Sequence, residues 1–66
     1  MSNLATELQK EIKRNQELRD EYLKIPEGII GAAMLKTDID FAIHAMAESN
    51  IVNELLAYEK LKKNEG

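Results

Sequence analysis

The chain has 66 residues with a formal net charge of −3 and no cysteine, so disulfides and thiolate metal sites are excluded. A chain of this length forms one small domain at most, residues 1–66, and buries only about 60% of the surface that its unfolded form exposes. We therefore expect its marginal stability to be completed by a partner chain.

The first predicted element is a long helix over about residues 3–24. Ser2 or Asn3 can serve as its N-cap, since such side chains accept hydrogen bonds from the first free backbone N–H groups of a helix. Its apolar residues form one narrow stripe, which suits a coiled-coil-like contact along one edge. The stripe consists of Leu4, Leu8, Ile12, Leu18, Tyr22 and Ile25.

Asn15 occupies an a position of the heptads along this stripe. A polar Asn at such a position can fix the register and the oligomer state of a coiled coil. The alternative is that the stripe is interrupted there and that Asn15 contacts solvent. Over only three heptads we favour the second interpretation.

A joint between two helices is predicted in residues 25–35, IPEGIIGAAML. Ile25 precedes a proline and is disfavoured in the helical conformation, whereas Pro26 suits the first turn of a new helix. No strand precedes this stretch and no GK[ST] follows, so it is not a phosphate-binding loop. Glycine destabilises a helix by about 0.5–1 kcal/mol relative to alanine, so we expect Gly28 and Gly31 where helices cross closely.

The second predicted helix covers about residues 27–48 and is apolar on two sides. One face carries Ala32, Leu35, Ile39, Ala42, Ile43 and Met46, and the opposite face carries Ile30, Met34, Phe41 and Ala45. A helix that is apolar on two sides is buried on two sides. In a lone chain the other two helices would have to cover both faces. In a dimer one face meets the chain's own helices and the other meets the partner, so we expect a homodimer.

The third predicted helix covers residues 51–63, after a turn at Ser49 and Asn50 in which Asn50 is the N-cap. Its predicted apolar face consists of Ile51, Val52, Leu55, Tyr58 and Leu61. The lysines of KLKK suit a helix C-terminus better than a phosphate contact. The predicted fold class is therefore all-α, a bundle of three helices completed by homodimerisation.

Asp40, His44 and Glu48 follow one another at four-residue spacing on the second predicted helix. A metal can use such ligands, and a symmetric dimer can supply a second set. The same spacing is typical of a solvated helix face, which we favour because one histidine per chain is a thin ligand set. Tyr22 and Tyr58 lie on apolar stripes, where core packing is expected. We predict no enzyme, no metal site and no cofactor.

Three short motifs lie along residues 22–63: Tyr-x-x-Ile-Pro-x-Gly with a later Gly-Ala, a small polar turn before two β-branched residues, and Ala-Tyr-Glu-x-Leu-Lys. Their residues are Tyr22, Ile25, Pro26, Gly28, Gly31, Ala32, Ser49, Asn50, Ile51, Val52, Ala57, Tyr58, Glu59, Leu61 and Lys62. On these motifs the chain resembles short uncharacterised helical proteins of Mu-like and related prophages, which carry Gly-Asp in place of Ser49 and Asn50. The resemblance implies a phage-derived origin and no known activity.

The expected function is that of a small non-enzymatic helical interaction protein, a homodimer that presents a surface to another protein. The alternative is an accessory nucleic-acid-associated regulator, which is disfavoured because the mixed charges form no basic face. The first ten residues lack the basic and apolar regions of a signal peptide, and residues 28–35 are too short to span a bilayer. We therefore expect a cytoplasmic protein.

The predicted dimer forms either by side-by-side packing or by exchange of the N-terminal helix between chains. The residues predicted to lie in or beside its interface are Ile30, Met34, Phe41, Gly28, Gly31, Leu8, Ile12 and Leu18.

Overall fold

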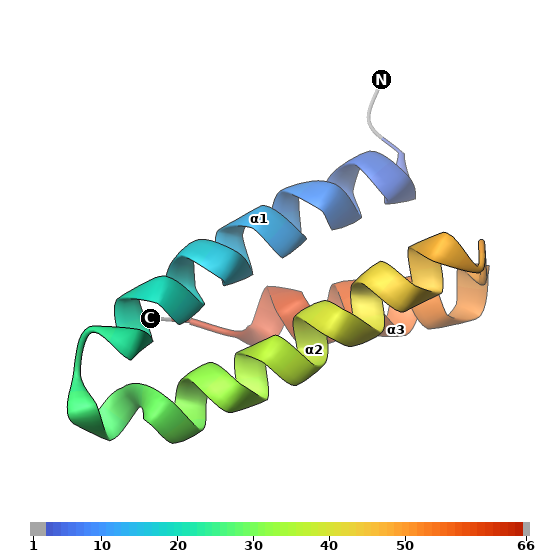
Figure 1. Ribbon diagram of the computed structural model, residues 1–66. Helices are drawn as coiled ribbons and strands as arrows, with labels where there is room; N and C mark the ends of the chain where they lie inside the picture. Colours follow the sequence, from blue (N-terminus) through green and yellow to red (C-terminus); the bar gives the residue numbers. More distant parts are fainter. Residues whose placement is uncertain (1–2, 66) are drawn as a thin grey trace.

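The computed structural model describes residues 3–65. Within this range the chain forms three α-helices, α1 (Leu4–Leu23), α2 (Ile29–Ala47) and α3 (Ile51–Lys63), with a 3₁₀ turn, η1 (Pro26–Gly28), before α2. α1 and α2 are an antiparallel pair joined at one end, and α3 lies behind them and runs back from the other end (Figure 1). The predicted all-α class and the positions of the three helices are confirmed.

Asparagine side chains cap the first and third helices. Asn3 Oδ1 accepts a hydrogen bond from the Thr6 backbone N–H at 2.9 Å, and Asn50 Oδ1 accepts one from the Asn53 N–H at 3.1 Å. Each bond satisfies an amide that has no partner within the first turn of its helix. The N-cap predictions at Asn3 and Asn50 are confirmed, and Ser2 lies outside the described residues.

Pro26 sets the corner between α1 and α2. Ile25 before it is extended, with φ −119° and ψ 138°, because the proline ring crowds the helical conformation of the preceding residue. Pro26 then begins the 3₁₀ turn η1, and the α-helix begins only at Ile29. The predicted joint is confirmed, although the α-helix starts slightly later than the predicted residue 27.

Two glycines allow the chain to turn tightly against Tyr22. A Cβ atom at Gly28 would overlap the backbone carbonyl of Tyr22. A Cβ atom at Gly31 would lie 2.8 Å from Cδ2 of the Tyr22 ring, closer than ordinary packing permits. The predicted close approach at both glycines is therefore confirmed as a contact within one chain.

A Schellman motif ends α2. The Asn50 N–H donates to the Ala45 carbonyl at 3.0 Å, and the Ser49 N–H donates to the Met46 carbonyl at 3.1 Å. Ser49 has φ 53°, in the left-handed region that favours glycine. A serine in this conformation is strained, because its Cβ approaches a neighbouring carbonyl oxygen.

Ser49→Gly is expected to stabilise the fold by about 1 kcal/mol, since the left-handed conformation costs a residue with a Cβ roughly 1–2 kcal/mol. Part of this gain is offset by the greater freedom of glycine in the unfolded chain. Thermal unfolding followed by circular dichroism should show Tm raised by about 4–8 °C. Ser49→Ala is the matched control, because it keeps the Cβ. A Tm for Ser49→Gly no higher than that of Ser49→Ala would contradict the strain at this position.

The core is small and receives side chains from all three helices. Its buried cluster consists of Leu8, Ile39, Ala42, Ala57 and Leu61, with Ile12, Phe41, Met46 and Tyr58 packed against it. Leu8 and Leu61 are its largest completely buried apolar side chains. Tyr58 packs against the core as predicted, while Tyr22 is half-buried and its hydroxyl donates to the Glu65 carbonyl at 2.7 Å.

The predicted apolar face of α3 is wrong in most of its residues. The buried residues of this helix are Glu54, Ala57 and Leu61. The other predicted members, Ile51, Val52 and Leu55, are 61%, 67% and 50% exposed. α3 packs against the other helices on the side that carries the small residue Ala57. The larger side chains of Ile51, Val52 and Leu55 therefore lie on its outer side.

Two residues of α2 differ in burial from the other members of their predicted faces. Ala45 is buried at 1% exposure, although it was placed on the second face. Ile43 is 47% exposed, although it was placed on the first. Ala42 and Ala45 both face inward, so the inner side of α2 is rotated toward its alanines relative to the prediction.

Candidate interaction surface

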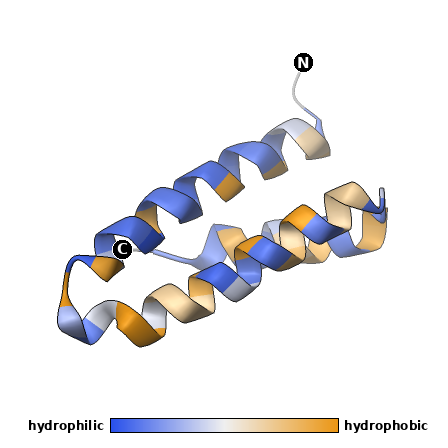
Figure 2. Ribbon diagram, viewed as in Figure 1, coloured by the Kyte–Doolittle hydropathy of each residue, from blue (hydrophilic) through white to orange (hydrophobic). Residues whose placement is uncertain are grey.

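Many large apolar side chains are exposed in the described part of the chain. They are Leu23, Ile25, Ile29, Ile30, Met34, Ile43, Ile51, Val52, Leu55 and Leu56. Figure 2 shows hydrophobic stretches of ribbon near the start of α2 and a mostly hydrophilic α1. Contiguous apolar surface on a folded chain marks a site of association. Among residues 3–65, no helix has the length and apolar character needed to cross a membrane.

One group consists of four of these residues and the half-buried Phe41, on the sides of α2 and α3 that the Phe41–Lys60 contact links. On α2, Ile30 and Met34 are one turn apart and 75% and 66% exposed, and the half-buried Phe41 follows two turns later. On α3, Val52 and Leu56 are one turn apart and 67% and 47% exposed. These five residues are called the α2–α3 surface below.

A contact between Phe41 and Lys60 joins the two parts of the α2–α3 surface. Lys60 Nζ lies 4.9 Å from the centroid of the Phe41 ring, within cation–π range. Because Lys60 follows Leu56 by one helical turn, the Leu56 side of α3 borders the Phe41 edge of α2. Lys62 Nζ lies 5.5 Å from the Tyr58 ring, so two lysines at the end of α3 contact aromatic rings of their own chain.

α3 is the shortest helix, and a groove begins where it ends. It has 13 residues, against 20 in α1 and 19 in α2, so the first helix overhangs the third as predicted. The groove has a volume of about 220 Å³. Its lining residues are Tyr22, Gly31, Met34, Leu35, Asp38, Asn64 and Glu65. Met34 belongs to both features, so the groove continues the α2–α3 surface.

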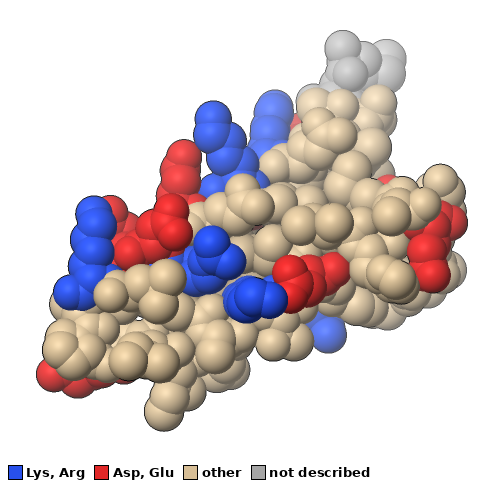
Figure 3. Space-filling view, viewed as in Figure 1, with Lys and Arg blue, Asp and Glu red and all other residues tan. Residues whose placement is uncertain are grey.

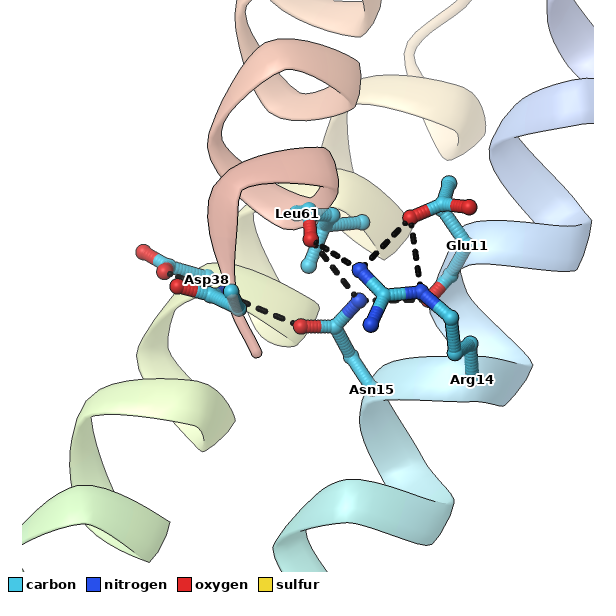
Figure 4. Close-up of polar contacts among 6 residues, drawn as sticks. Glu11, Arg14, Asn15, Asp38 and Leu61 are labelled. Atoms are coloured by element: carbon cyan, nitrogen blue, oxygen red, sulfur yellow. Dashed lines mark hydrogen bonds and ion pairs between the residues drawn. The ribbon is translucent and has the colours of Figure 1, made fainter. Parts of the chain in front are cut away.

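A buried polar network holds the end of α3 against α1 (Figure 4). Asn15 has no exposed area, and its amide nitrogen donates to the carbonyls of Glu11 at 2.8 Å and Leu61 at 3.2 Å. Arg14 Nη2 donates to the same Leu61 oxygen at 2.7 Å and pairs with the Glu11 carboxylate at 2.9 Å. Carbonyls in the last turn of a helix lack donors within the helix. The Leu61 carbonyl accepts from the Asn64 backbone N–H at 3.2 Å and, in addition, from these two side chains of α1.

Asn64 extends this network to α2. Its amide nitrogen donates to Asn15 Oδ1 at 3.0 Å and to the Asp38 carboxylate at 3.1 Å. The expectation that Asn15 contacts solvent is therefore wrong. A buried amide must find hydrogen-bond partners, and Asn15 finds them in a segment that follows it by more than forty residues. Asn15 thus fixes the register of α1 against α3 within one chain.

Asp40 and His44 on α2, and Glu48 directly after it, are exposed. They belong to two separate pairs, one of Asp40 with Lys36 and one of His44 with Glu48. Lys36 Nζ lies 2.8 Å from Asp40 Oδ2, and His44 Nε2 lies 3.2 Å from Glu48 Oε2. No cluster of three or more side chains able to hold a metal ion occurs within residues 3–65. Both pairs have the four-residue spacing of ordinary contacts along a helix surface.

The structure divides the predicted interface residues into two sets. The first set lies on the α2–α3 surface and consists of Ile30, Met34 and Phe41. The second set is buried or half-buried within the chain and consists of Leu8, Ile12, Leu18, Gly28 and Gly31. Leu8 has no exposed area, so it contacts a partner only in a dimer that exchanges α1. Val52 and Leu56 are not among the predicted interface residues. Their four-residue spacing is a signal for a shared side of α3, but hydrophobicity alone does not distinguish the inner from the outer side of this helix.

No family model, no curated protein and no solved structure matches the chain. The resemblance of residues 22–63 to prophage proteins stays a prediction. The structure itself defines an all-α protein of three packed helices that exposes apolar side chains compatible with an oligomer.

Proposed function

We propose that the chain is a small non-enzymatic interaction protein that forms a homodimer through the α2–α3 surface and presents another surface to a different protein. The observation that carries the proposal is the line of Ile30 and Met34, which are 75% and 66% exposed beside the groove at the end of α3. In a monomer these side chains remain in water. Burying them against a second chain gains about 25 cal/mol for each Å² of apolar area.

The shape of the molecule suits a twofold contact, in which the same patch of each chain meets its copy. The molecule measures 37 × 22 × 16 Å, so the α2–α3 surface runs along a long flank. Specific interfaces bury about 800 Å² on each partner. The chain exposes 4688 Å², of which such a contact covers roughly one sixth. None of the five side chains of the α2–α3 surface is charged. Lys60, which lies over the Phe41 ring, is the cation that must stay at the margin of the contact to avoid the desolvation penalty of a buried ion.

Met34→Glu is expected to convert the dimer into a monomer. Met34 is 66% exposed within its own chain, so the fold of the monomer tolerates a glutamate there. In the dimer the new carboxylate is desolvated without a partner, which costs several kcal/mol. Size-exclusion chromatography with light scattering measures the mass, and circular dichroism verifies that the helices remain. Phe41 is less suitable for this test, because it also packs against the core of its own chain.

Ile43→Glu is the matched control for Met34→Glu. It makes a similar apolar-to-acid change on the same helix at a side chain that is 47% exposed and lies outside the α2–α3 surface. We expect Ile43→Glu to remain a dimer. A Met34→Glu variant with the wild-type mass, or an equal loss of dimer in both variants, would contradict the assignment of the interface.

A further inference from the structure

A second groove lies between α1 and α2 and receives no residue from α3. It has a volume of about 260 Å³. We call it the basic-rimmed groove. Its lining residues are Arg19, Leu23, Ile29, Ala32, Ala33 and Lys36. Ile29 and Ala33 lie roughly 100–140° around α2 from Met34, so this groove and the α2–α3 surface use different sides of the helix. Figure 3 shows Lys and Arg side chains near the junction of α1 and α2, and uncharged surface below them over the start of α2.

The apolar part of the basic-rimmed groove is open to solvent. Leu23 and Ile29 form its larger walls and are 55% and 63% exposed. Ala32 is 3% exposed and Ala33 is exposed, and their small side chains leave the space between the walls free. The volume is below the about 300–1,000 Å³ of sites that enclose drug-sized ligands. The groove therefore suits one or two side chains of a peptide better than a whole small molecule.

Arg19 lies at the rim of this groove, and its Nε is buried without a hydrogen-bond partner among residues 3–65. Its Nη2 is in a long ion pair with Asp20 Oδ1 at 3.8 Å, too far for a hydrogen bond. A buried donor without a partner costs about 1–3 kcal/mol. The Arg19 side chain is 32% exposed, so a carboxylate that arrives from the groove can reach the guanidinium. Lys36 adds a second positive charge, which is 63% exposed and paired with Asp40.

We propose that the basic-rimmed groove binds an acidic, apolar peptide segment of a partner protein. One or two large apolar side chains of the segment enter between Leu23 and Ile29, and a neighbouring carboxylate accepts hydrogen bonds from Arg19. Charge complementarity selects this occupant, because a guanidinium binds a carboxylate through two parallel hydrogen bonds. Two cations, each of them in an ion pair within the chain, offer too few phosphate contacts for a nucleic acid. The peptide site lies on a side of α2 that the proposed dimer does not use. An experiment can therefore contradict the peptide site without contradicting the dimer, and the reverse.

Selection from a displayed library of random peptides on immobilised wild-type protein tests the chemistry of the occupant. The enriched peptides are expected to share one or two large apolar residues next to Asp or Glu. Enrichment of basic peptides, or no enrichment, would overturn the proposal. A dilution series on Met34→Glu, which is expected to be monomeric, tests whether a second copy of the chain fills the groove instead. Chemical shifts of the groove amides that change on dilution of this variant alone would also overturn the proposal.

Arg19→Gln tests the site on the protein. Fluorescence anisotropy measures the dissociation constant of one enriched, labelled acidic peptide. We expect this constant to rise about ten-fold or more in Arg19→Gln, because the variant loses a charge-assisted hydrogen bond. Lys13→Gln removes one positive charge from an exposed position on the same helix and is the matched control, with affinity expected to stay near that of wild type. Met34→Glu should also bind the peptide, which separates this site from the dimer contact. Equal losses in Arg19→Gln and Lys13→Gln, with circular dichroism showing both folded, would contradict a site at Arg19.

Discussion

Leu61→Ala is expected to lower the free energy of unfolding by about 2–5 kcal/mol, the cost of removing a buried leucine side chain and leaving a cavity. Leu61 is completely buried and packs in the cluster that contains Leu8 and Ile39. A core of this size rarely supplies more than about 3–5 kcal/mol in total. The variant should therefore be largely unfolded at room temperature, or close to it.

Urea denaturation followed by circular dichroism measures this effect. Leu55→Ala is the matched control, because it makes the same change on the same helix at a side chain that is 50% exposed and outside the α2–α3 surface. Its effect should stay within about 0.5 kcal/mol of zero, as for most surface substitutions. Equal losses in the two variants would mean that α3 packs through a face different from the one described.

Asn15→Asp is expected to lower the free energy of unfolding by about 3–5 kcal/mol, the cost of an uncompensated buried charge. The substitution changes few atoms but replaces an amide nitrogen that donates to the carbonyls of Glu11 and Leu61 with an oxygen that cannot donate when ionised. The new charge also lies in a network that contains the Asp38 carboxylate. Repulsion and lost hydrogen bonds act in the same direction, and the attraction of the Arg14 guanidinium, which donates to the same Leu61 carbonyl, offsets only part of their effect.

Gln16→Glu is the control for this prediction, because it makes the same amide-to-acid change at the next residue of α1, which is exposed. We expect little change in its urea midpoint at neutral pH, and a clearly lower midpoint for Asn15→Asp. A wild-type midpoint in Asn15→Asp would show that this position is hydrated in solution and that the network is not a buried one.

The helix boundaries could be predicted because the signals that set them are local. Asn3 and Asn50 cap helices through residues only three positions away, and Pro26 restricts its immediate neighbour. The glycines at the corner were also predictable, since a glycine in a helical stretch indicates a close approach. What they approach, the backbone and ring of Tyr22, became visible only in the structure.

The inner faces were harder to predict, because hydrophobicity does not distinguish the side chains that meet their own chain from those that meet a partner. In α3 the most apolar arc, around Ile51 and Val52, points outward, while Ala57 and Glu54 point inward. The contacts of Asn15 were equally hidden. They depend on Leu61 and Asn64, more than forty residues later, and no local pattern reports a partner at that distance.

The start of α2 exposes apolar side chains on two sides, which are not the two predicted faces, since the prediction places Ile29 on neither of them. Ile29 lines the basic-rimmed groove on one side, and Ile30 and Met34 line the α2–α3 surface on another. Neither side is covered by the chain itself, since all three residues are more than half exposed. The proposed dimer contact would cover one of these sides and the proposed peptide the other.

Sedimentation equilibrium of the wild-type protein over a range of micromolar concentrations tests the proposed homodimer most directly. One chain has a mass of 7.5 kDa. The proposed contact through the α2–α3 surface predicts a species of twice that mass, which dissociates only on dilution. A single species of 7.5 kDa at every concentration in that range would contradict the dimer and leave Ile30 and Met34 exposed in solution.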